Sequence, residues 1–210
     1  MKIKRNTSKR PKIGSHGLKV YKGTKVYIGK ATTSKPAPSQ EIVNLFTDLW
    51  NNDPSIKKLR KHIDYIKITY RLSGNLVGTW NKSDKKVTII DSGSSYTNHK
   101  SVIVHEIIGH AFWDFSRKWR RTEITKFNEL ANKLPPVNSY VEQNERKWKT
   151  WNDDCDSVCV DKVGHDGCTR YANEQHSAIT ELIYGETHHT TLLDDEHIHQ
   201  LKVLWEELHY

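Results

Sequence analysis

The stretch His105-Glu106-Ile107-Ile108-Gly109-His110 lies inside an apolar run that extends from Val102 to Phe115. Two histidines four residues apart lie about 40° apart around a helix and can bind one ion, whereas a separation of five residues places them about 140° apart. The two imidazoles reach the same ion only if the helix accommodates one extra residue. A π-bulge does this, and such bulges are frequent at functional sites. The spacing therefore predicts a helix that widens between the histidines, and Gly109 eases the distortion.

The acidic residue of this stretch, Glu106, is flanked by apolar neighbours such as Val104 and Ile107. One interpretation is a buried helix whose polar residues are incidental. An ionised carboxylate, however, is costly to bury without a charge partner. A bound zinc ion would supply that partner, together with a water molecule on which Glu106 could act. The apolar setting therefore favours a Zn²⁺ site.

Hydrophobic periodicity divides the chain into a first half with strands and a second half with helices only. Ser39 is a suitable cap for the first helix, and Pro135-Pro136 ends a later one. In the first half we expect helices over 41–50 and after Pro54, and strands over 65–72, 76–80 and 87–90. The helix with the two histidines then spans 98–119, and further helices span 122–134, 140–151, 171–184 and 194–209, with a polar loop over 153–170. The fold class is therefore α+β.

Residues 1–40 differ in composition from the rest of the chain. They contain eleven Lys and Arg and no acid, which leaves 22 basic and 25 acidic residues over 41–210. A six-residue repeat over 19–29 predicts two short strands, and 31–40 resembles a linker. We expect residues 1–40 to form a basic tail that binds polyanions weakly, and the folded domain to occupy 41–210.

A catalytic zinc ion needs three protein ligands, so a third one must come from elsewhere in the chain. Glu174, on the helix over 171–184, is the preferred candidate. Glu181 lies seven residues further along the same helix face, where it could orient a histidine ligand. The alternatives are that Glu174 is an ordinary acid of a first helical turn, or that His176 or, less favoured, Glu181 is the third ligand.

This combination resembles a known group of enzymes. A half with strands, an HExxH-like helix, a helical half and a downstream helical Glu are similar to the zincin metallopeptidases of the gluzincin type. The HExxxH spacing resembles that of the dipeptidyl-peptidase III family. The resemblance implies a zincin-like catalytic domain over 41–210, with His105, His110 and Glu174 as zinc ligands and Glu106 as the general base.

The chemistry implied is hydrolysis of peptide bonds in a peptide or protein substrate. Zn²⁺ polarises a water molecule and the scissile carbonyl, and Glu106 takes the proton and delivers it to the leaving amine. Tyr171 is a candidate donor to the oxyanion, with Tyr140 and His176 as alternatives. The substrate could add as a strand to the edge formed by 76–80, where Gly78 leaves the backbone accessible.

A second cluster of metal-binding side chains follows, with the spacing C-x3-C-x5-H-x2-C. It predicts a structural metal site formed by Cys155, Cys159, His165 and Cys168. The spacing matches no standard zinc finger, so one disulfide with a free thiol, or three free thiols, are open alternatives.

Two further functions compete with the peptidase hypothesis. One is a nucleic-acid-associated zinc protein that uses the basic tail, and the other is a zincin-like protein that binds peptides without cleaving them. No apolar segment is long enough to cross a membrane. The odd cysteine count and the lack of an apolar core after the basic N-terminus predict a cytoplasmic location.

Overall fold

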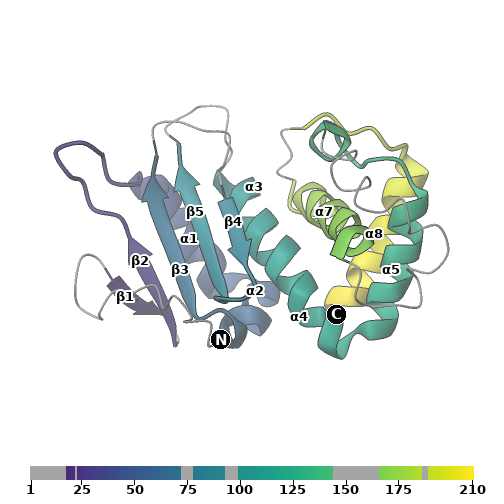
Figure 1. Ribbon diagram of the computed structural model, residues 1–210, viewed down its shortest axis with the longest axis horizontal. Coiled ribbons are helices and arrows are strands. Elements are labelled where there is room, and N and C mark those ends of the chain that lie inside the picture. The colour runs from purple at the N-terminus through teal and green to yellow at the C-terminus, as the bar shows by residue number, and fades with distance from the viewer. Residues whose placement is uncertain (1–17, 22, 72–77, 93–98, 144–165, 186–188) are drawn as a thin grey trace, which may run out of the picture.

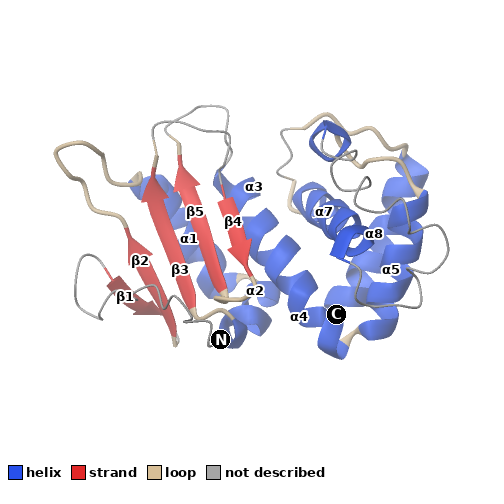
Figure 2. Cartoon of the chain, in the orientation of Figure 1, coloured by secondary structure: helices blue, strands red, loops and turns tan. Residues whose placement is uncertain are grey.

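The computed structural model describes residues 18–21, 23–71, 78–92, 99–143, 166–185 and 189–210. One mixed sheet and the helices on its far side form one half, and a group of helices forms the other (Figures 1 and 2). The sheet has the order β1-β2-β3-β5-β4. Its strands are β1 (Leu18–Tyr21), β2 (Thr24–Ile28), β3 (Tyr65–Tyr70), β4 (Gly78–Asn81) and β5 (Lys86–Asp91).

The three central strands run parallel, and the two outer strands run antiparallel to their neighbours. Every second residue of the central strands is buried, as period-2 alternation requires of a sheet with one covered face; these residues are Val26, Ile66, Ile68, Val87 and Ile89. A tight hairpin joins β4 to β5 through Lys85, which has a φ of 47°. Among the described strands β4 pairs only with β5, so none of them covers its other backbone edge.

Two helices behind the sheet in Figure 1 cover its buried face. Helix α1 (Gln40–Asn52) begins at Ser39, whose hydroxyl accepts from the backbone N–H of Ile42. Helix α2 (Pro54–Leu59) begins at Asp53, which caps it in the same way, and is followed by the short 3-10 turn η1 (Arg60–His62). These side-chain caps satisfy N–H groups that a helix start leaves unpaired. The expected starts of both helices are confirmed.

The helix with the two histidines consists of three consecutive segments. They are α3 (His99–Ile103), the π-helix η2 (Val104–Ala111) and α4 (Phe112–Trp119). The predicted π-type widening between His105 and His110 is therefore confirmed. It extends over eight residues rather than a single bulge.

The second half of the described chain contains helices and no named strand. Helices α5 (Arg121–Lys133), α7 (Asp166–Ile183) and α8 (Asp195–His209) pack together, and α7 also packs along η2 (Figure 1). Large buried rings fill the space between them, among them Trp113, Phe127 and Trp205. Within the described ranges, no helix combines the length and apolar character that crossing a membrane requires.

Three expectations about the elements need correction. The sheet begins at Leu18, and Val26 is fully buried where β2 pairs with β3, so a domain boundary at residue 40 would divide the sheet. Helix α7 begins at Asp166, inside the stretch expected to be a loop over 153–170. Of the helix expected over 140–151, residues 139–143 are helical, and the remainder lies outside the described residues.

Candidate metal centre

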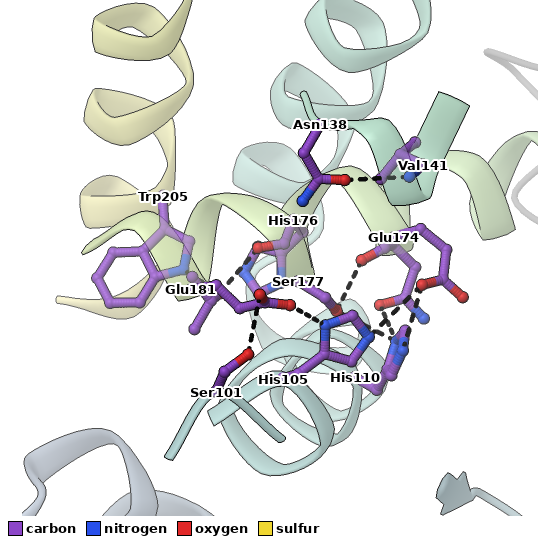
Figure 3. A network of polar contacts seen from close by, with 12 residues as sticks. Ser101, His105, His110, Asn138, Val141, Glu174, His176, Ser177, Glu181 and Trp205 are labelled. Carbon is purple, nitrogen blue, oxygen red and sulfur yellow. Dashed lines mark hydrogen bonds and ion pairs between the residues drawn. The ribbon is translucent and has the colours of Figure 1, made fainter. Parts of the chain in front are cut away.

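Three side chains from two distant segments converge at the contact between η2 and α7 (Figure 3). Glu174 Oε2 lies 3.6 Å from His105 Nε2 and 3.5 Å from His110 Nε2. Ligand atoms that surround one tetrahedral ion at 2.0–2.1 Å lie about 3.3 Å from one another. The two observed separations are close to this value, so His105, His110 and Glu174 could hold one metal ion.

The second ring nitrogen of His105 is held by a carboxylate. His105 Nδ1 lies 2.6 Å from Glu181 Oε1, and Ser101 Oγ donates to Glu181 Oε2 at 3.0 Å. A proton on Nδ1 that points at Glu181 leaves Nε2 directed at Glu174. Glu181 therefore fixes the orientation of the His105 ring, in the way that its position on the helix predicted.

The second ring nitrogen of His110 is held by neutral groups on α7. Its Nδ1 lies 3.1 Å from Asn173 Oδ1 and 3.2 Å from Ser177 Oγ. Ser177 Oγ donates its own hydrogen to the carbonyl of Asn173, so it accepts from the ring. In both rings Nδ1 is thus held by a hydrogen-bond acceptor while Nε2 is directed at Glu174, which is the orientation that a metal-binding histidine needs.

The close approach of η2 and α7 depends on Gly109. A Cβ at this position would lie 2.4 Å from Ser177 Oγ and 2.9 Å from its Cα, well inside van der Waals contact. The glycine thus removes a side chain from the line where the two helices meet. The sequence suggested that Gly109 eases the π distortion, and the structure shows the additional role of allowing this contact.

Charge at the centre favours a cation. Burial opposes protonation of His105, but hydrogen bonds to Glu174 and Glu181 outweigh it and raise its pKa well above the usual value. Glu174 is only 7% exposed and Glu181 only 4%. Two buried carboxylates need a compensating positive charge. Without an ion, a proton on His105 supplies part of that charge, and a divalent ion at this position would take its place.

Glu106 lies beside the three ligands and against the edge strand. It is 6% exposed, and burial raises its pKa above the ordinary value even though the two histidines oppose the shift. The backbone N–H of Trp80 donates to its carboxylate, while its Oε2 has no hydrogen-bond partner among the described residues. A Cβ at Gly78 would lie 2.6 Å from Glu106 Cγ. Gly78 therefore makes room for this carboxylate.

The alternative ligand His176 points to the other side of α7. Its Nε2 lies 3.1 Å from His209 Nε2, and the ring is fully buried beside Trp113 and Trp205. Burial lowers its pKa to about 3, with a further contribution from His110. His176 is therefore a neutral core residue, and the geometry favours Glu174 over it as third ligand.

The role expected for Tyr171 is not supported by its position. Its side chain is fully buried, and its hydroxyl donates to the carbonyl of Leu134 at 3.2 Å while accepting from Gln175 Nε2 at 3.1 Å. With its hydrogen directed to the backbone, the hydroxyl supports the packing of α7 on α5. We correct the expectation that Tyr171 stabilises an oxyanion.

A different tyrosine lies beside the centre. The Tyr140 ring is edge-on to His105 at 6.2 Å and stacks on His189 at 5.3 Å. Gln175 anchors the preceding segment, because its Oε1 accepts from the backbone N–H of Val137 at 2.7 Å. Tyr140, the alternative donor in the sequence, thus lies against the ring of His105.

The cysteine cluster is not tested by the structure. Cys155, Cys159 and His165 lie outside the described residues, and Cys168 is described only as part of the backbone of α7. The metal site predicted for them stays a prediction.

The groups that hold the histidine rings were only partly anticipated. Asn173 and Ser177 were not singled out, although with Glu181 they recur every four residues on one face of α7. A polar stripe beside buried alanines and isoleucines is the signal that could have identified them. No protein-family model, curated protein or solved structure matches the chain.

Proposed function

We propose that this protein is a zinc-dependent peptidase, with His105, His110 and Glu174 as zinc ligands and Glu106 as the general base. The observation that carries the proposal is the convergence of both Nε2 atoms on Glu174 Oε2 while each Nδ1 is held by a separate group. A purely structural metal site would not need a further buried carboxylate beside the ligands. Glu106 is such a carboxylate, and its Oε2 has no hydrogen-bond partner among the described residues. Glu106 fits the role of a base there.

A zinc ion in this position would supply a polarised water molecule and an electrophile for the scissile carbonyl. Glu106 takes the proton from the water and transfers it to the leaving amine. Glu181 and Asn173 keep the two imidazoles fixed during the reaction.

The edge of β4 that does not pair with β5 is the proposed binding site for the substrate backbone, which would use the backbone groups other than the Trp80 N–H held by Glu106. An extended peptide can pair with such an edge through main-chain hydrogen bonds. Gly78 and Trp80 of this strand contact Glu106, so a peptide paired with β4 would run beside the base. Tyr140, supported by His189, replaces Tyr171 as the proposed donor to the oxyanion.

Metal counting on three proteins tests the zinc site. We expect the wild type to hold zinc at this centre, His105→Ala to lose that zinc and Cys155→Ser to keep it. If His105→Ala retains the full metal content while Cys155→Ser loses it, the zinc is structural and the enzyme hypothesis fails.

The peptidase activity is tested separately with Glu106→Gln. General bases contribute roughly 10²–10⁴-fold to rate, so this variant should keep its zinc and fold while losing hydrolysis of a mixed peptide library by at least that factor, as read by mass spectrometry. Equal cleavage by both zinc-loaded proteins would indicate a contaminating protease. Peptide binding without turnover in either protein would favour a non-catalytic zincin-like protein.

A further inference from the structure

A ladder of aromatic rings leads from the edge strand to the molecular surface. The Trp80 ring of β4 contacts Phe115 at 5.6 Å, and Phe115 stacks on His62 at 4.7 Å. His62 in turn contacts Trp119 at 4.6 Å. The last ring is 59% exposed, whereas the others are partly covered. Large exposed aromatic side chains are uncommon on a soluble surface and often mark an interaction site.

Lysines from three separate segments surround the outer end of this ladder. Lys61 of η1, Lys85 of the β4–β5 hairpin and Lys118 of α4 are all exposed. Lys61 and Lys118 are the chain neighbours of His62 and Trp119, and the carbonyl of Lys85 accepts from the backbone N–H of Asp64, two residues after His62. Burial lowers the pKa of His62, and the charges of the three lysines lower it further. Together His62, Trp119 and the three lysines form what we call the basic aromatic surface.

The edge strand connects this surface to the candidate metal centre. Trp80 Nε1 donates to Asp114 Oδ2 at 2.7 Å, and Lys82 Nζ donates to Asp114 Oδ1 at 2.9 Å. These bonds fasten the hairpin end of β4 to α4, while Gly78 at the other end contacts Glu106. A peptide paired with β4 would be extended, with a rise of about 3.3 Å per residue. Its residue beside the hairpin would therefore lie about four residues from the residue opposite Gly78.

We propose that the basic aromatic surface binds acidic residues, accompanied by an apolar residue, in a segment of the peptide substrate that extends beyond β4. This inference rests on the proposed function and deepens it by naming the substrate class. The lysines complement carboxylates, and Trp119 offers an apolar face between them. A single-stranded nucleic acid fits less well, because it needs a row of exposed rings for successive bases, and Trp119 is the one exposed ring of this ladder.

The test uses the full chain, loaded with zinc and carrying Glu106→Gln so that bound peptide stays intact. The probes are one neutral fluorescent peptide and two versions extended by Glu-Phe-Glu at either the N- or the C-terminus. We expect one of the two extensions to tighten binding by roughly tenfold at low salt, since two exposed ion pairs contribute up to about this much. The gain should shrink as salt rises.

Substitutions assign the gain to this surface. The double substitution Lys85→Gln and Lys118→Gln should abolish it, and Trp119→Ala should reduce it. The matched controls, Lys133→Gln with Lys202→Gln and Val203→Ala, remove charge or apolar area from α5 and α8 and should leave it unchanged. With Glu106 intact, the surface variants should cleave the unextended neutral peptide at the wild-type kcat/KM.

Two results would overturn the inference. One is that neither extension tightens binding, or that the gain survives the double lysine substitution. The other is that an oligo-dT strand binds with dependence on Lys85, Lys118 and Trp119 while the extended peptides do not, which would make this a nucleic-acid surface. If the wild type cleaves no peptide but the extensions still bind through these lysines, the acidic docking surface stands and the peptidase proposal falls.

Discussion

The contact between Gly78 and Glu106 leads to a sharp prediction for Gly78→Ala. An added Cβ would lie 2.6 Å from Glu106 Cγ and 2.7 Å from its Oε1. Restoring an ordinary contact of at least 3.4 Å requires a shift of about 0.8 Å. Because the carboxylate is at the end of a flexible side chain, it moves more easily than either backbone. A misplacement of about 1 Å can cost ~10²-fold in rate, so we expect that loss in kcat with zinc content unchanged.

The assay compares zinc-loaded variants on one cleaved peptide. Gly29→Ala is the matched control, since its new Cβ meets nothing closer than 3.5 Å and should leave activity unchanged. In the Glu106→Gln background, Gly78→Ala should cost almost nothing further, because both changes act on the same group. If fully folded, zinc-loaded Gly78→Ala hydrolyses the peptide at the wild-type rate, Glu106 is not a base positioned by β4.

Three further predictions concern the metal and the core. Glu181→Gln should weaken zinc binding by roughly 10–100-fold, measured by competition with a chelator, because it removes the carboxylate that holds His105. Gly109→Ala should destabilise the fold by about 1–3 kcal/mol in urea unfolding, because its Cβ overlaps Ser177. Burial keeps the pKa of His209 well below the usual value, so its stabilising contribution is full above about pH 6.5 and is lost as the pH falls. His209→Gln should therefore lose less stability than the wild type between pH 7.5 and 5.5, and equal losses would contradict this.

Much of the centre could be predicted from spacing alone. A separation of five residues between His105 and His110 is incompatible with one ion on a regular helix, and the structure has the π-helix that resolves this conflict. Glu174 and Glu181 could be placed because a seven-residue separation keeps two side chains on one helix face. These inferences depend on local geometry, which a sequence encodes directly.

The errors arose where long-range packing decides the outcome. Tyr171 lies one turn from Glu174 on the same helix, but its hydroxyl donates to the carbonyl of Leu134, the residue that follows α5. No local sequence pattern reveals this contact. Strand β2 was assigned to a tail because its neighbours are polar and basic. It belongs to the sheet because Val26 and Ile28 pair with β3 across two intervening helices. Tertiary context outweighs local composition in both cases.

The hydrogen bonds around the centre join residues that are 63 to 80 positions apart in the chain. A long loop must therefore close before the ligands meet, and a π-helix has little stability of its own until α7 packs against it. The centre should consequently form late in folding. An ion that binds to both η2 and α7 would then stabilise the native state but not the transition state for folding. It would slow unfolding and leave the folding rate almost unchanged.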